Sequence, residues 1–198
     1  MKRLMTAAMF VLATLVYTPV HAFPIALPGS EGLAVIVTSA DPVIATFQGN
    51  SGSYSNDLYL MLTGAGVPGD DGLTANDLFV FNNLTSVVGS SLTLGSFAPG
   101  TELRFRLYVN DTGETFFTGP ASRNPDGLPH ARVQSDWMDD EALVSFEDLF
   151  GTPEGVDGFN DLSFSFTNTR AVPEPALLSL FGMAAAATAW RARRRSRA

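Results

Sequence analysis

The stretch ELRFRLYV, residues 102–109, decides the fold class. Its apolar side chains alternate one by one with polar or amphipathic ones: Leu103, Phe105, Leu107 and Val109 on one side, Arg104, Arg106 and Tyr108 on the other. A period of two places successive side chains on opposite faces of a β-strand. The pattern therefore predicts a strand that buries one face and carries its arginines on the other.

Nine further short β-rich runs surround this stretch. They cover residues 33–38, 42–47, 57–62, 77–81, 91–94, 115–118, 130–134, 142–146 and 161–167. Clusters of Gly, Asn, Asp and Pro separate the runs and supply turn geometries. Residues 39–41 are predicted to form a hairpin-like break between the first two runs. No helical period appears before the C-terminal region, so we expect an all-β fold, a single β-sandwich or jelly-roll-like domain over residues 23–171.

The N-terminal region has the three zones of a secretory signal peptide. Lys2 and Arg3 are positive, residues 4–16 are apolar, and Val20-His21-Ala22 is a small-residue cleavage site. We therefore expect residues 1–22 to be a signal peptide helix that is cut between Ala22 and Phe23. A retained N-terminal anchor is the alternative.

The C-terminal region, residues 172–198, also has three zones. Val172, Pro173, Glu174 and Pro175 come first, residues 176–190 carry no charge, and an arginine cluster with Arg191, Arg193, Arg194 and Arg195 follows. The prolines exclude a helix that continues from the preceding domain, so a membrane helix is expected to begin at about residue 176. At about 1.5 Å per residue this helix reaches about 22 Å, short of a hydrocarbon layer of roughly 30 Å. The arginines are expected to stay cytoplasmic. A retained single-span anchor and a buried C-terminal helix are the alternatives.

Together these three zones resemble the PEP-CTERM sorting signal of exported proteins of Gram-negative bacteria. The resemblance implies export across the inner membrane, transient anchoring there and recognition by an exosortase-type processing enzyme. It further implies removal of the tail and delivery of the body to the cell surface or to an exopolysaccharide, biofilm-associated matrix.

The net charge and the lack of cysteine limit which partners and which sources of stability are expected for residues 23–171. The chain has a formal net charge of −8, but residues 23–171 contain five arginines, no lysine and nineteen acidic residues, a net charge of −14. This sign disfavours a nucleic-acid partner and is compatible with divalent cations or a hydrated matrix. The chain has no cysteine, so the stability of an exported body must come from its core or from bound metal.

The tripeptide Asn-Asp-Leu occurs three times, beginning at Asn56, Asn76 and Asn160. Asn and Asp suit the turn at the entry to a strand, and the Leu would then pack inward. We take this structural interpretation first. The alternative is that carboxylates and Asn carbonyls at the strand ends bind calcium, which prefers six to eight oxygen ligands.

The third copy lies in a region, residues 146–151 and 157–168, that resembles a C-terminal β motif in a domain of unknown function common among PEP-CTERM proteins. Calcium is suspected there, and the resemblance implies that Glu147, Asp148, Asp157, Asn160 and Asp161 are its ligands. Gly158 and Val156 stand where that motif usually has Asp, so fewer carboxylates are present here. Calcium is the one cofactor that the residues suggest.

No residue pattern predicts catalysis. His130 is the one histidine of residues 23–171, no serine lies in a Gly-x-Ser-x-Gly turn, and zinc ligands do not cluster. We therefore expect no enzyme and no catalytic residues, and predict a non-enzymatic surface or matrix protein. The alternative is a carbohydrate-binding or carbohydrate-cleaving domain, with Tyr54, Tyr59, Tyr108 and Trp137 as a stacking platform for sugars.

Overall fold

The computed structural model describes residues 23–151 and 158–173, and these form antiparallel β-strands in three sheets. The five-stranded sheet has the order β5 (Ser91–Ser96), β2 (Pro42–Gly49), β11 (Leu162–Thr167), β10 (Glu141–Phe146), β9 (Ala131–Met138). The four-stranded sheet has the order β4 (Leu78–Asn82), β3 (Asn56–Leu60), β7 (Phe105–Val109), β8 (Thr115–Phe117). The three-stranded sheet has the order β12 (Thr169–Val172), β1 (Ala34–Val37), β6 (Glu102–Leu103). Two short 3₁₀ helices, η1 (Thr74–Asn76) and η2 (Ala121–Arg123), complete the described part, and the all-β prediction is confirmed.

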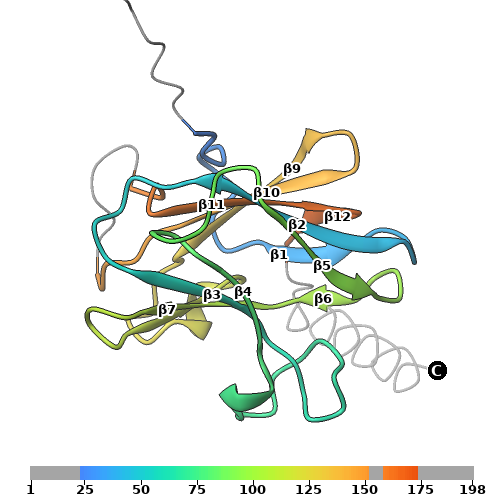
Figure 1. The fold of residues 1–198 in the computed structure, drawn as a ribbon, viewed down its shortest axis with the longest axis horizontal. Helices are drawn as coiled ribbons and strands as arrows, with labels where there is room; N and C mark the ends of the chain where they lie inside the picture. Colours follow the sequence, from blue (N-terminus) through green and yellow to red (C-terminus); the bar gives the residue numbers. More distant parts are fainter. Residues whose placement is uncertain (1–22, 152–157, 174–198) are drawn as a thin grey trace, which may run out of the picture.

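Figure 1 shows the five-stranded and four-stranded sheets as two layers of a sandwich. Aromatic rings from both layers fill the space between them. The ring centre of Phe81 on β4 lies 6.1 Å from that of Phe47 and 5.8 Å from that of Phe164. Phe105 of β7 stacks on Phe166 of β11 with 4.3 Å between the ring centres. Such ring pairs add to the stabilisation that comes from burying apolar area.

The three-stranded sheet joins the two layers. β11 continues into β12 through Asn168, and β6 continues into β7 through Arg104. The predicted alternation over residues 102–109 is confirmed, since Leu103, Phe105, Leu107 and Val109 are all fully buried. The stretch is divided at Arg104 because β6 pairs with β1 whereas β7 pairs with β3.

The predicted hairpin around residues 39–41 is wrong, because β1 and β2 belong to different sheets. The side chain of Asn168 holds this segment as a corner between the three-stranded and the five-stranded sheet. Its Nδ2 donates to the backbone oxygens of Ser39 and Asp41 at 3.1 and 2.7 Å, and its Oδ1 accepts from the Ser39 hydroxyl. The strand β12 was not among the predicted runs; it forms because its four residues pair with β1.

All three Asn-Asp-Leu copies stand at the entry to a strand, as predicted: β3 begins at Asn56, β4 at Leu78 and β11 at Leu162. Leu58 and Leu162 are fully buried and Leu78 is partly buried against the core. In the described ranges, 23–151 and 158–173, no helix is long and apolar enough to cross a membrane. The predicted signal-peptide and C-terminal helices lie outside these ranges.

Candidate functional site

Three carboxylates gather where β10 ends and β11 begins. Glu147 and Asp148 follow β10 directly, and Asp161 immediately precedes β11. The two strands are antiparallel neighbours with Phe146 opposite Leu162, and the Asp161 N–H donates to the Phe146 oxygen at 3.1 Å. One oxygen from each carboxylate therefore lies within 4.8 Å of the others. We call Glu147, Asp148 and Asp161 the acidic cluster.

The acidic cluster is withdrawn from water, with exposed fractions of 1%, 3% and 8%. Burial, and then the charge of the Asp148 carboxylate, raise the pKa of Asp161 to about 7, although the Asp148 N–H donates to Asp161 Oδ2 at 2.9 Å and favours the ionised form. The repulsion between the carboxylates of Asp148 and Asp161 favours a proton on Asp161, and a bound divalent cation would relieve the same repulsion. The cluster thus has the electrostatics of a cation site.

Asn56 supplies an independent sign of a missing partner. Its side chain is fully buried, and its Nδ2 donates to Asp148 Oδ2 at 2.6 Å. Its Oδ1, however, is buried and has no hydrogen-bond donor within residues 23–151 and 158–173. A buried polar atom of this kind carries a desolvation cost. Turning the amide by 180° would exchange Oδ1 and Nδ2 and place Oδ1 beside the Asp148 carboxylate, where a shared cation would replace the present hydrogen bond between Nδ2 and Asp148.

A hollow of about 280 Å³ opens beside the cluster and is lined by residues 51–54, Asp148, Leu149, Asn160 and Asp161. Gly52 makes the close approach possible, since a Cβ at this position would lie 2.7 Å from Asp161 Oδ1. The donor set is oxygen only, three carboxylates and an amide, which fits calcium and not zinc.

Of the five predicted calcium ligands, the structure brings three together in the acidic cluster and places Asn160 in the wall of the same hollow. Asp157 lies outside the described residues. Asn56 was not predicted as part of this site. The Asn-Asp-Leu repeat was the available signal, because the first copy provides Asn56 and the third provides Asp161.

His130 lies next to the acidic cluster, and its contacts are those of a residue that stabilises the fold. Its Nδ1 is 3.0 Å from the Glu147 backbone oxygen and its Nε2 is 2.8 Å from Asp126 Oδ2, while its ring stacks on Phe116 at 3.7 Å. Both ring nitrogens are therefore engaged. The imidazole links β9 to the start of the acidic cluster.

The four aromatic residues suggested as a sugar platform do not gather in one place, so that platform is wrong as predicted. Tyr59 and Tyr108 line one cleft on the four-stranded sheet. Tyr54 lines the hollow at the acidic cluster, and Trp137 lies on β9.

The C-terminal end of the described body is a strand that enters the predicted sorting signal. Val172 pairs with Ala34 and Ala171 with Val35, so β12 closes against β1. Pro173 follows without a backbone N–H to donate, which suits the end of the strand. Phe23, on the far side of the predicted signal-peptide cut, is described and half-buried, whereas Ala22 and residues 174–198 are not described.

The comparisons with known proteins identify this C-terminal region. The model of the PEP-CTERM protein-sorting motif matches residues 171–195. No curated protein and no solved structure was found to match the chain. The resemblance of the body to a domain of PEP-CTERM proteins stays a prediction. The chain therefore carries a PEP-CTERM sorting signal, which marks it as an exported protein that is anchored transiently in a membrane and processed by an exosortase-type enzyme.

Proposed function

Because the PEP-CTERM motif occupies residues 171–195, we propose that this protein is a non-enzymatic structural component of the surface or extracellular matrix of a Gram-negative bacterium. The observation that carries the proposal is the motif itself, attached directly to the last strand of an all-β body. The strongly acidic body suits a hydrated matrix rather than nucleic acid.

The proposed cut separates the tail from a finished sandwich. β12 pairs with β1 up to Val172, so processing that spares the body occurs after this residue. A cut before β12 would leave β1 paired only with the two residues of β6. Exposed strand edges of this kind promote association with other chains.

We further propose that the acidic cluster binds calcium outside the cytoplasm. Glu147, Asp148 and Asp161 would supply carboxylate oxygens, and Asn56 would supply its amide oxygen. The ion would tie the β10 and β11 ends to the start of β3, which belong to the two layers of the sandwich. In a chain without cysteine, such a link takes the place of a disulfide.

The sorting proposal is tested in cells of an exosortase-containing Gram-negative host. The full chain is compared with a variant lacking residues 176–195 and with expression in a strain without the exosortase. We expect surface or matrix delivery of the full chain only in the complete system. Equal surface delivery in all three cases would overturn the proposal.

The calcium proposal is tested by isothermal titration of the metal-free full chain with calcium. We expect one binding event that is lost in the Asp161→Ala variant and kept in Asp139→Ala, which removes an exposed acid from the β9–β10 turn. Identical titrations of the two variants would show that the acidic cluster is not the site.

A further inference from the structure

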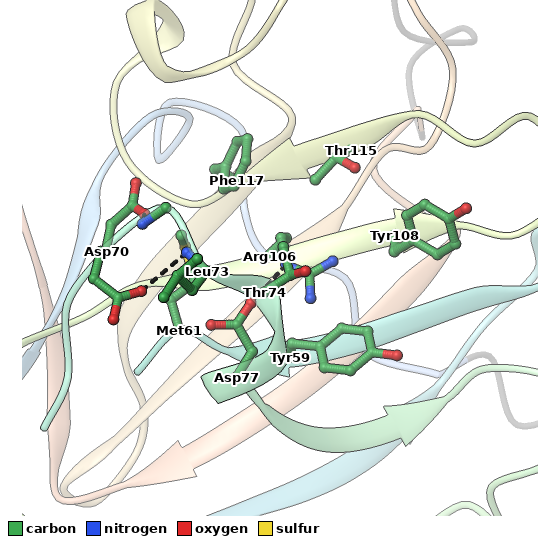
Figure 2. A pocket seen from close by; sticks show the side chains of 12 residues that line it. Tyr59, Met61, Asp70, Leu73, Thr74, Asp77, Arg106, Tyr108, Thr115 and Phe117 are labelled. Carbon is green, nitrogen blue, oxygen red and sulfur yellow. Dashed lines mark hydrogen bonds and ion pairs between the residues drawn. The ribbon is translucent and has the colours of Figure 1, made fainter. Parts of the chain in front are cut away.

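A cleft of about 570 Å³ lies on the outer face of the four-stranded sheet, opposite the core. Tyr59, Arg106 and Tyr108 point into it from β3 and β7, at positions that alternate with buried residues. The segment between β3 and β4, with η1, forms its other wall. The volume falls within the roughly 300–1,000 Å³ of small-ligand sites. Figure 2 shows these side chains around one opening.

Arg106 is fixed at the floor of this cleft. Its side chain is only 8% exposed, its Nε donates to Asp77 Oδ2 at 2.9 Å, and its guanidinium lies 4.2 Å from the centre of the Tyr59 ring. Asp77 is itself held, because its Oδ1 accepts from the Leu62 N–H at 3.2 Å. The guanidinium is thus preorganised before any ligand arrives.

The two terminal nitrogens of Arg106 have no hydrogen-bond acceptor among the residues that the structure describes. Figure 2 places them on the side of the cleft that faces Tyr59 and Tyr108. Four N–H groups are therefore available to a ligand in a site whose arginine is more than nine-tenths buried. A buried donor set of this kind calls for acceptor oxygens.

The charges around the cleft indicate whether the ligand that supplies these acceptor oxygens is neutral or anionic. Asp70, Asp71 and Asp77 line it together with the single cation Arg106, so its net charge is negative. Asp71 accepts from Gly64, Leu73 and Asn76. Asp70 accepts from the Gly72 N–H at its Oδ1, and within the part of the chain that the structure describes its Oδ2 has no donor. An anionic ligand would be repelled. A neutral ligand with hydroxyl groups can accept from Arg106 and donate to Asp70, because each hydroxyl does both.

We propose that this cleft binds a neutral glycan. Hydroxyls of one hexose unit would accept from the terminal nitrogens of Arg106, and the ring of Tyr108 would pack on the apolar C–H face of that sugar. A hydroxyl of a neighbouring unit would donate to Asp70 on the other side of the opening. Phe117 extends the same apolar wall from β8. The inference deepens the proposed matrix role by naming a ligand class, and it rests on that role for its biological setting.

The test is calorimetric titration of the calcium-loaded full chain, in a detergent without a sugar headgroup. The probes are linear hexasaccharides of glucose, of mannose and of galactose, and a hexamer of galacturonic acid. We expect one or more of the neutral probes to bind more tightly than the galacturonic acid hexamer. Absence of neutral binding up to the low-millimolar range, or tighter binding of the uronic acid, would overturn the inference.

Two variants locate the binding. Arg106→Lys keeps the charge beside Asp77 but removes the guanidinium fork, and Tyr108→Ala removes the stacking ring. Each is expected to weaken the neutral probe about tenfold or more, which corresponds to about 1.4 kcal/mol. Trp137→Ala, which truncates a half-buried aromatic residue on β9, is the matched control and should bind as the unaltered chain does. Unchanged affinity in a folded Arg106→Lys or Tyr108→Ala protein would place the sugar elsewhere. Because this titration does not depend on delivery, its failure leaves the sorting proposal standing.

Discussion

Replacing Asp161 by Asn is expected to stabilise the metal-free protein and to abolish its stabilisation by calcium. The amide oxygen can still accept the hydrogen bond that the Asp148 N–H now donates to Asp161 Oδ2. The change therefore removes one negative charge from the acidic cluster with little loss of shape. Two opposite effects of one substitution follow, depending on whether calcium is present.

The magnitude follows from the pKa of Asp161, which burial and the neighbouring Asp148 raise from 3.8 to about 7. A carboxyl with a raised folded-state pKa binds more protons in the folded than in the unfolded chain, so the stability of the metal-free protein falls as pH rises from about 4 to about 7. The full cost, roughly 4 kcal/mol at most, is present above pH 7. The Asp161→Asn variant lacks this cost. Calcium at about a hundred times its Kd would instead add about 2.7 kcal/mol to the unaltered chain.

The assay is urea unfolding of the full chain, followed by circular dichroism at pH 5 and pH 8, in chelator and in calcium. Asp139→Asn is the control, because it removes the same charge from an exposed turn. In chelator at pH 8 the Asp161→Asn protein should be the more stable one, and the difference should shrink at pH 5. If the variant is less stable than the unaltered chain at pH 8 in chelator, hydrogen bonds compensate the buried charge of Asp161 and the cluster carries no repulsion for calcium to relieve.

Three other substitutions test the fold and the site. Asp77→Ala leaves the Arg106 guanidinium buried without its carboxylate and should cost about 3–5 kcal/mol in urea unfolding, more than Asp77→Asn; equal, small losses would argue against a buried ion pair. Phe164→Ala removes a fully buried ring between the layers and should also cost about 3–5 kcal/mol, and a loss under about 1 kcal/mol would contradict the packing described. Gly52→Ala places a methyl group against Asp161 Oδ1 and should weaken calcium binding in titrations, whereas unchanged affinity would mean that the ion avoids this oxygen.

The sandwich could be predicted because the alternation of apolar and polar residues along a strand is a local pattern in the sequence. The alternation in residues 102–109 records which side chains face the core, and the structure buries those four apolar residues completely. The same alternation placed Arg106 on the outer face but did not reveal that it is buried there. That burial depends on Asp77, which lies 29 residues away in the chain.

The errors arise where distant residues decide the geometry. Residues 39–41 look like a hairpin turn, yet the side chain of Asn168 converts them into a corner between sheets. β12 is short and exists through its pairing with β1. Neither contact has a signature in the local sequence.

The candidate calcium site also combines residues with a local sequence signal and a residue that only the fold brings in. The acids at residues 147, 148 and 161 were predicted as ligands from a resemblance to a motif, and the structure places them together. Asn56 enters the cluster from the opposite layer of the sandwich. Its unsatisfied Oδ1 can be recognised only in three dimensions. A repeated tripeptide indicated that the strand entries were alike, and the fold determined which two of the three meet.

The intact mass of the protein recovered from the cell surface distinguishes a processed, delivered chain from an unprocessed one. We expect a chain that begins at Phe23, ends after Val172 and lacks the arginine cluster, and that appears only when the exosortase is present. An unprocessed chain that still carries Arg191 to Arg195 and stays in the inner membrane, with or without the exosortase, would contradict this expectation.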